Sequence, residues 1–151
     1  MIEDDFYEKY RQSNNPITSY DVLFELSKDN NFTIRRNIAR NTSTHASILE
    51  FLSKDEHWYV RSVVAQNPNA SKEVLNSLSK DGDKNIRYWV AKNPSASKET
   101  VDYLSNDTDR AVRYLVAKHP NTSKEILNDL LNDRDEGVRV ATINSLNERD
   151  N

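Results

Sequence analysis

The sequence predicts an all-α fold, an α-solenoid of about five two-helix repeats of 26 residues each. The first observation is that an isoleucine or valine followed by arginine recurs at a fixed spacing of 26 residues. The second is that apolar residues with helical spacing recur in the same register. A fixed period in this range is typical of proteins that stack one structural unit. The five copies are Ile34-Arg35, Val60-Arg61, Ile86-Arg87, Val112-Arg113 and Val138-Arg139.

The register divides the chain into a cap, repeats and a tail within one predicted domain, residues 1–151. Residues 1–14 take the place of a further helix and form an amino-terminal cap, with Phe6, Tyr7 and Tyr10 as its expected apolar contacts. A short carboxy-terminal tail, residues 145–151, ends the chain. The repeats between cap and tail are residues 15–40, 41–66, 67–92, 93–118 and 119–144.

Each repeat predicts two helices. An Asn-Pro pair or a relative of it ends the previous helix, since proline is poorly tolerated inside a helix. A capping signal follows, clearest in Thr122 with Glu125 three residues later, and predicts a longer first helix with apolar residues at i, i+1 and i+4. A polar turn with an aspartate precedes a shorter second helix, V-R-x-x-V-A. Its recurring alanine indicates little space where helices cross, and Ile143 departs from that rule in the last repeat.

The chain resembles the variant leucine-rich repeat family, a bacterial helical solenoid, in the pattern N-P-N-x-S-x-E-x-L-x-x-L-x-x-D followed by V-R-x-x-V-A. The resemblance covers about residues 15–144 and implies alternating longer and shorter helices in a right-handed superhelix. The D-x-x-x-x-x-R spacing also resembles the aspartate and arginine ladder of HEAT repeats. The best-known family member carries an iron-sulfur cluster held by cysteines. This sequence has no cysteine, so no cofactor is expected.

Composition excludes several classes of function. The net charge of −3 argues against a protein that coats nucleic acid or anionic membranes indiscriminately. Without cysteine, thiol chemistry and thiolate metal sites are excluded. The two glycines form no phosphate-binding loop. The acidic start differs from a signal peptide, and no apolar run approaches a membrane span, which indicates a cytoplasmic protein.

An arginine follows an aspartate by six residues in every repeat. Guanidinium groups suit phosphate and carboxylate ligands, so these arginines would form an anion-binding stripe. The constant spacing favours a structural ladder between adjacent repeats, whose exposed pairs would contribute only ~0–1 kcal/mol each. The ladder residues are Asp29, Arg35, Asp55, Arg61, Asp81, Arg87, Asp107, Arg113, Asp133 and Arg139.

A second set of residues varies between repeats and lies opposite the fixed apolar face on a helical wheel of the second helix. We call this side the variable face. It is basic and aromatic on an acidic protein, as binding hot spots often are. In the alternative interpretation, Tyr88, Trp89 and Leu115 pack between neighbouring helices and the lysines are solvated. The candidate partner-binding residues are Arg36, Arg40, Tyr88, Trp89, Lys92, Tyr114, Leu115 and Lys118, with Gln66 beside them.

The leading hypothesis is a non-enzymatic, monomeric interaction module that binds a protein or peptide through the variable face. Nucleic-acid binding along the same face is an alternative, by analogy with HEAT-like DNA glycosylases. A further alternative is an accessory or inhibitory protein that acts on a host enzyme through the acidic turns at 107–109 and 133–136. No catalytic residue is predicted. His45, His57 and His119 lack metal-ligand spacing, so no metal site is predicted either.

Overall fold

A computed structural model describes residues 2–149, with side chains from residue 5 onward. Within residues 2–149 the chain forms eleven helices and no strand, which confirms the all-α class. The helices group into two compact units, described separately below. The first unit ends at Val74 and the second begins at Leu75, so that α6 (Lys72–Leu78) contains the boundary. The prediction that residues 1–151 form one domain stays a prediction.

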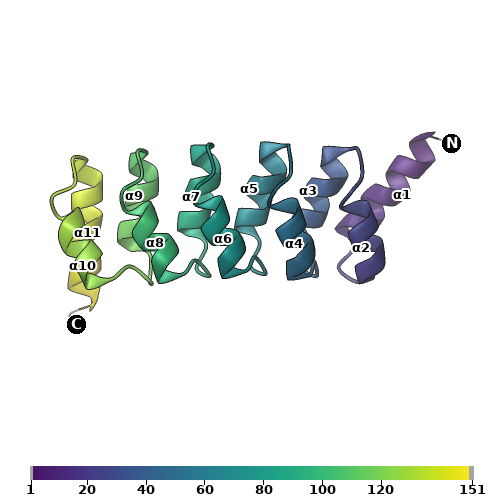
Figure 1. Cartoon of the computed structure of the whole chain (residues 1–151). Coiled ribbons are helices and arrows are strands. Elements are labelled where there is room, and N and C mark those ends of the chain that lie inside the picture. The colour runs from purple at the N-terminus through teal and green to yellow at the C-terminus, as the bar shows by residue number, and fades with distance from the viewer. Residues whose placement is uncertain (1, 150–151) are drawn as a thin grey trace. The chain divides into compact units, whose positions relative to one another are not determined.

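The first unit consists of two layers of helices (Figure 1). The odd-numbered helices lie side by side, with α3 in contact with both α1 and α5. The even-numbered helices form the second layer, and each contacts the odd-numbered helices before and after it in the chain. The helices of this unit are α1 (Ile2–Asn14), α2 (Tyr20–Leu26), α3 (Phe32–Arg40), α4 (Ala46–Leu52) and α5 (Trp58–Gln66).

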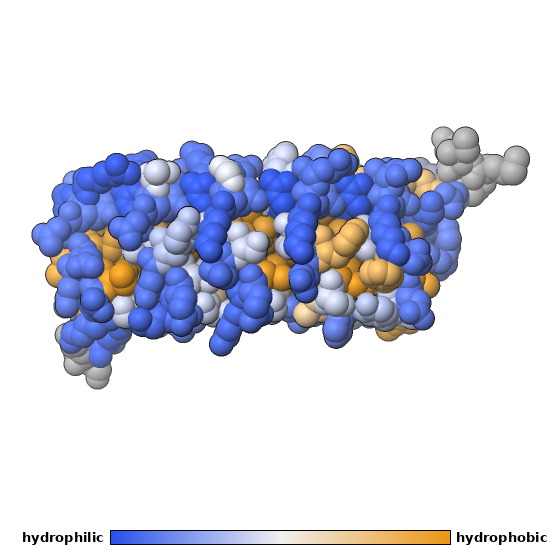
Figure 2. Space-filling model, viewed as in Figure 1, coloured by the Kyte–Doolittle hydropathy of each residue, from blue (hydrophilic) through white to orange (hydrophobic). Residues whose placement is uncertain are grey.

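The second unit repeats this arrangement. Helix α9 contacts α7 and α11, while α8 and α10 form the other layer. On the even-numbered side of each unit, Figure 2 shows hydrophilic side chains that stand over a band of apolar residues. The helices are α7 (Lys84–Lys92), α8 (Lys98–Leu104), α9 (Arg110–Lys118), α10 (Lys124–Leu130) and α11 (Glu136–Arg149).

The sequence predicted the wrong helix of each repeat to be the longer one. The first helix of each repeat, expected to be the longer, has seven residues, whereas the second helices α3, α5, α7 and α9 have nine. In four repeats a serine follows the first helix, and its hydroxyl donates to the carbonyl oxygen three residues earlier, as in Ser27 to Phe24 (2.6 Å) and Ser53 to Glu50 (2.7 Å). Helix α10 is followed by Leu131 and is equally short, so the serine does not determine the length. The second helix starts early because the residue two after the turn aspartate caps it, as Asp109 does for Ala111.

The capping residue predicted for the first helix is also wrong. Ser123, not Thr122, accepts the backbone N–H of Ile126 at the start of α10. The Thr122 hydroxyl is buried and donates to the carbonyl oxygen of Val116, near the end of the preceding helix. The threonine therefore joins two consecutive helices, which explains why alanine, also buried, occupies the same position in other repeats.

The apolar stripes form the core of each unit, as predicted. Leu49, Leu52 and Val101 are fully buried, and so are the paired apolar residues of the second helices. The recurring alanine is also buried in all four copies, which confirms that a larger side chain has little room there. Ile143, the exception, lies on an exposed part of α11. The buried alanines are Ala39, Ala65, Ala91 and Ala117.

The cap forms the predicted helix, but two of its three expected contacts are wrong. Tyr7 and Tyr10 are 68% and 42% exposed, and only Phe6 is half-buried. The buried polar residue of α1 is Ser13, whose hydroxyl accepts a hydrogen bond from Asn37 of α3 (3.2 Å). The helix therefore docks through small and polar groups near its carboxyl end, and its tyrosines face outward.

In three repeats a buried side chain at the start bonds to the start of the repeat before it. Asn41 Nδ2 donates to the Asn15 carbonyl oxygen (3.0 Å), and Asn67 Nδ2 donates to that of Asn41 (3.2 Å). His119 stands at this position in the second unit, with Nε2 3.0 Å from the Asn93 carbonyl oxygen. Because its Nδ1 accepts the Asn121 N–H, Nε2 carries the proton and the ring is neutral.

The first prediction concerns His119. Burial lowers its pKa below 6.5, and the charge of Arg149 acts in the same direction. The unfolded chain therefore binds the proton more readily, so the histidine's contribution to stability is present above that pH and lost as the pH falls below it. His119→Asn, which restores the residue of the other repeats, is expected to reduce the fall in urea-unfolding free energy between pH 7.5 and 5.5.

The matched control is His45→Asn, since His45 is exposed and caps α4. The pH dependence should fall more in His119→Asn than in His45→Asn, because His119 is buried and His45 is exposed. An unchanged pH dependence in His119→Asn would contradict the role assigned to the buried ring.

Candidate functional site

Three arginines of the ladder each hold the aspartate of the following repeat through two hydrogen bonds. Arg35 Nε donates to Asp55 Oδ2 (2.7 Å) and Nη2 donates to Oδ1 (3.0 Å). Its Nη1 donates to the carbonyl oxygen of Asp29, six residues earlier (2.8 Å). One guanidinium therefore joins its own turn to the next one. The same contacts recur in Arg87 with Asp107 and in Arg113 with Asp133.

These pairs are buried, so the expectation of exposed pairs is wrong. The side chains of Arg35 and Asp55 are 9% and 5% exposed, and those of Arg113 and Asp133 are 5% and 6% exposed. The hydrogen bond from Arg113 holds the pKa of Asp133 below its usual range. Removal of one partner from such a pair leaves a buried charge and costs about 3–5 kcal/mol. The bonds occupy these guanidinium groups with oxygens of their own unit, which favours the structural ladder over an anion-binding stripe.

The remaining ladder residues show how the series begins and ends. Asp29 accepts from Lys9 of α1 (3.2 Å), so a lysine of the cap takes the role that an arginine has elsewhere. Arg61 donates to the Asp55 carbonyl oxygen (2.8 Å), and Arg139 donates to that of Asp133 (2.7 Å). The carbonyl oxygen of Asp81 accepts from Arg87 (2.9 Å). The five predicted ladder aspartates thus lie at the turns between first and second helices, and each ladder arginine donates to such a turn from the second helix.

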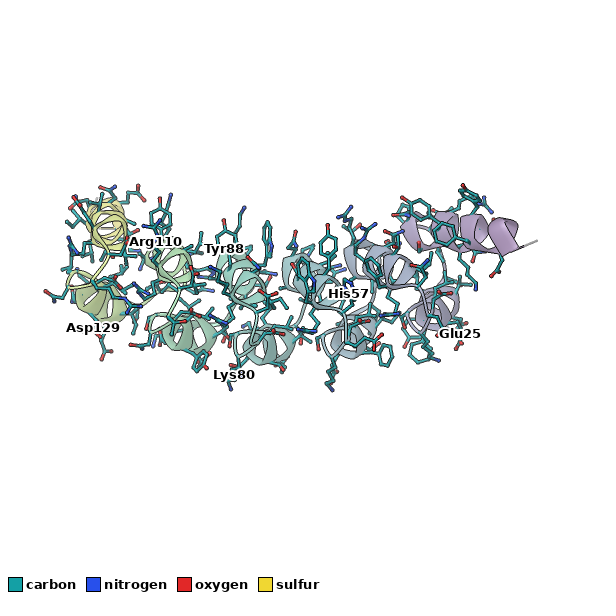
Figure 3. The ribbon with its side chains drawn as sticks, turned by 90° about the horizontal axis from the view of Figure 1, so that it is seen from above. Glu25, His57, Lys80, Tyr88, Arg110 and Asp129 are labelled. Atoms are coloured by element: carbon teal, nitrogen blue, oxygen red, sulfur yellow. The ribbon has the colours of Figure 1, made fainter. Side chains whose placement is uncertain are left out.

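The variable face of the second unit combines aromatic rings with lysines. Lys92 Nζ lies 4.9 Å from the ring centroid of Trp89, and Lys118 Nζ lies 5.5 Å from that of Tyr114. Neither lysine takes part in an ion pair within the described residues. Tyr114 is 40% exposed, and Figure 3 shows Tyr88 pointing away from the even-numbered helices.

Part of this face also packs between helices. Trp89 and Leu115 are half-buried, at a position where the first unit has the buried residues Asn37 and Val63. The two interpretations of the sequence therefore apply to different residues. Trp89 and Leu115 contribute to packing between odd-numbered helices, whereas Tyr114 and the two lysines are exposed.

The first unit brings the predicted cations close to aromatic rings that the sequence analysis did not single out. Arg40 is exposed, and the guanidinium of Arg36 lies 5.5 Å from the ring centroid of Tyr59. His57 stacks on Phe32 of the neighbouring odd-numbered helix, with centroids 4.0 Å apart and planes 3° apart. The exposed ring of Trp58 continues this stack towards Tyr59. The register could have identified these residues, since Phe32 and Trp58 occupy equivalent positions.

A groove of about 650 Å³ lies between α9 and α11 on the odd-numbered side of the second unit. One end carries an ion pair between Arg110 Nη1 and Asp135 Oδ2 (3.4 Å). The sequence analysis placed only Tyr114 of this groove among the candidate site residues. The residues that shape it are Arg110, Tyr114, Gly137, Val140, Ala141 and Asn144.

The histidines have three different structural positions. His45 and His57 accept backbone N–H groups at the starts of α4 and α5, and His119 bonds to the preceding repeat. Among the residues with described side chains, no three His, Cys, Asp or Glu gather in an arrangement that could hold a metal ion. None of the helices within residues 2–149 has the length and apolar character needed to cross a membrane.

Comparison with protein-family models and with the sequences of curated proteins finds no match to this chain.

The second prediction concerns the buried ladder. Arg113→Ala is expected to lower the free energy of unfolding by about 3–5 kcal/mol, because it leaves the Asp133 carboxylate buried and unpaired. Arg110→Ala, on the same helix, removes an ion pair with an exposed arginine and should cost no more than about 1 kcal/mol. Urea unfolding at pH 7 measures both values. Equal losses in the two variants would show that burial of the ladder does not determine its strength.

Proposed function

We propose that the chain is an α-solenoid related to the variant leucine-rich repeat and HEAT families, and that it is a non-enzymatic module that binds a protein or peptide. Contacts in register support the solenoid, since Asn41, Asn67 and His119 each bond to a residue 26 positions earlier. The buried ladder recurs with the same spacing in both units. The proposal includes a cytoplasmic, monomeric protein, and these two features rest on the sequence alone.

One observation carries the binding proposal: large exposed apolar side chains concentrate on the odd-numbered helices of both units. In the first unit they include Phe32 and Trp58, and in the second Tyr114, Val140 and Ile143. The even-numbered helices have fewer, and Figure 3 shows charged side chains such as Glu25, Lys80 and Asp129 on that side. Exposed apolar and aromatic groups next to cations are typical of protein-binding surfaces.

Charge favours an acidic partner for the variable face of the second unit. Lys84 pairs with Asp109 (3.0 Å) and Arg110 with Asp135, so these cations are already neutralised. Lys92 and Lys118 lie over aromatic rings instead. A carboxylate of a partner would meet a positive charge there without displacing an ion pair of the chain.

The acidic turns at 107–109 and 133–136, which are compatible with an inhibitory protein, are neutralised in the same way. Asp107 and Asp133 accept from ladder arginines, and Asp109 and Asp135 accept from Lys84 and Arg110. These four carboxylates are therefore poorly placed to imitate an acidic ligand of another enzyme.

The third prediction tests the binding proposal. Tyr114→Ala combined with Trp89→Ala is expected to reduce capture of partner proteins from a lysate of the native host at least about tenfold, since two aromatic contacts of the face are lost. Tyr103→Ala is the matched control, because Tyr103 is an exposed tyrosine of the even-numbered α8 with Lys80 Nζ 5.7 Å from its ring centroid.

Capture must be compared at equal folded fraction, measured by thermal unfolding, since Trp89 also packs between helices. Equal capture by the double variant and the original chain would overturn the proposal. Loss of capture in Tyr103→Ala alone would show that the binding surface lies on the even-numbered side of the unit.

Nucleic-acid binding is the second candidate, and the ring stack of the first unit favours it. Single-stranded nucleic acids bind by stacking of bases on exposed aromatic rings beside cations. Trp58 supplies an exposed ring within the stack, and Arg36 and Arg40 lie on the same row of helices. The acidic net charge opposes this candidate.

The fourth prediction separates the two candidates. If the stack binds nucleic acid, labelled single-stranded DNA should bind at low salt, and its affinity should fall steeply when the salt concentration is raised. Trp58→Ala should then weaken binding, by about 1–3 kcal/mol for one stacked base. Fluorescence anisotropy at 50 and 200 mM salt measures both effects. No binding at 50 mM salt would eliminate this candidate.

A further inference from the structure

We infer that the groove between α9 and α11 receives a bulky apolar side chain of an acidic peptide, and that a carboxylate of the same peptide binds Lys118. The inference rests on the proposed function, because it assigns a ligand class to the variable face of the second unit. It adds a specific anchor point that the sequence did not indicate.

The groove exists because two helix positions that carry larger side chains elsewhere in the unit are small in α11. Ala141 occupies the position of Leu115 in α9 and Trp89 in α7. Gly137 occupies the position of Ala111 in α9 and of asparagine in α7. Since Leu115 and Trp89 fill the space beside their helices as half-buried side chains, the small residues of α11 leave that space open. Its volume of about 650 Å³ exceeds that of a single large side chain.

The middle of the groove is lined by apolar and aromatic residues and is open to solvent. Tyr114 forms one wall, and Val140, which is 50% exposed, lies on the other. Ala141 is buried between them. An apolar side chain placed here would remove water from both walls, at about 25 cal/mol per Å² of apolar surface. An aromatic side chain would also stack against the Tyr114 ring.

The charges at the two ends of the groove differ, which specifies the acidic character and the direction of the peptide. At the end where the helices begin, Asp135 neutralises Arg110, and the exposed Glu136 repels further negative charge. Past the other end, Lys118 lies over the ring of Tyr114, which lines the groove, and it has no ion pair within the described residues; Asn144 adds an amide to the lining. A carboxylate next to the apolar anchor is therefore favoured on the Lys118 side.

The experiment uses random dodecapeptides displayed on phage and selected on the immobilised full chain. We expect enrichment of peptides in which a bulky apolar residue adjoins glutamate or aspartate. Synthetic copies of the enriched peptides, labelled with fluorescein, then report Kd by anisotropy. Asn144→Trp fills the groove and should weaken these peptides at least about tenfold. Lys118→Glu should weaken them by a similar factor and select basic peptides when the display is repeated.

Asn128→Trp is the matched control, because it makes the same substitution at an exposed asparagine of α10 in the same unit. It should bind the peptides like the original chain. Thermal unfolding of all variants separates a loss of binding from a loss of folding. Asn144→Ala provides a second check, since it leaves the groove open and should retain most of the affinity.

Three results would overturn the inference: enriched peptides that bind Asn144→Trp normally, enrichment of basic peptides by the original chain, or no enrichment at all. Failure here is distinguishable from failure of the proposed function. If partner proteins captured from a lysate bind Asn144→Trp but not the double variant at Trp89 and Tyr114, the function stands and the groove has no part in it. If Asn144→Trp instead abolishes binding of labelled single-stranded DNA, the groove serves a nucleic acid and the peptide inference is wrong.

Discussion

The buried contact between an arginine and the aspartate of the next repeat is the constraint on which the rest of the structure depends. A charged pair removed from water is tolerated only when every partner is in place. Arg113 bonds to the turn before it through the Asp107 carbonyl oxygen and to the turn after it through Asp133. A repeat longer or shorter by one residue would leave one of these groups buried without its partner. The pair therefore fixes the repeat length at 26 residues. This structural role is larger than its modest net contribution to stability would suggest.

Because the turns fix the register, the outer ends of the second helices are free to vary. One contact between neighbouring odd-numbered helices demonstrates this. The first residue of one odd-numbered helix contacts the capping residue of the next odd-numbered helix. In the first unit this contact is a ring stack between Phe32 and His57. In the second unit the same positions form ion pairs, from Lys84 to Asp109 and from Arg110 to Asp135. Two chemically unrelated contacts thus satisfy one geometry, and the choice between them changes what the surface offers to a partner.

The sequence correctly predicted the features that follow from the 26-residue period and from helical spacing. It did not predict the features that depend on local hydrogen bonds or on neighbouring helices. The apolar stripes and the buried alanines follow from spacing alone. The helix lengths did not, because a side-chain cap such as that of Asp109 on Ala111 decides where the second helix begins. A helical wheel also treats a helix as isolated. It places Trp89 and Leu115 on the variable face, although the equivalent residues of the first unit, Asn37 and Val63, are buried. The groove beside Val140 was not predicted, because small side chains, those of Gly137 and Ala141, create it and give no signal in the sequence.

The clearest pKa shifts among the described residues arise from the contacts that hold the helices together. Shifted pKa values often mark catalytic sites, where they prepare a group for proton transfer. Here each of the clearest shifts has an architectural cause. The pKa of Asp133 is lowered by the ladder, that of Asp109 by its bond to Lys84, and that of His119 by burial at the start of a repeat. These shifts are therefore consequences of the contacts within and between the helices. The residues that remain exposed, Tyr114 and Lys118 among them, contribute shape, apolar surface and charge, and these are the properties by which one macromolecule selects another.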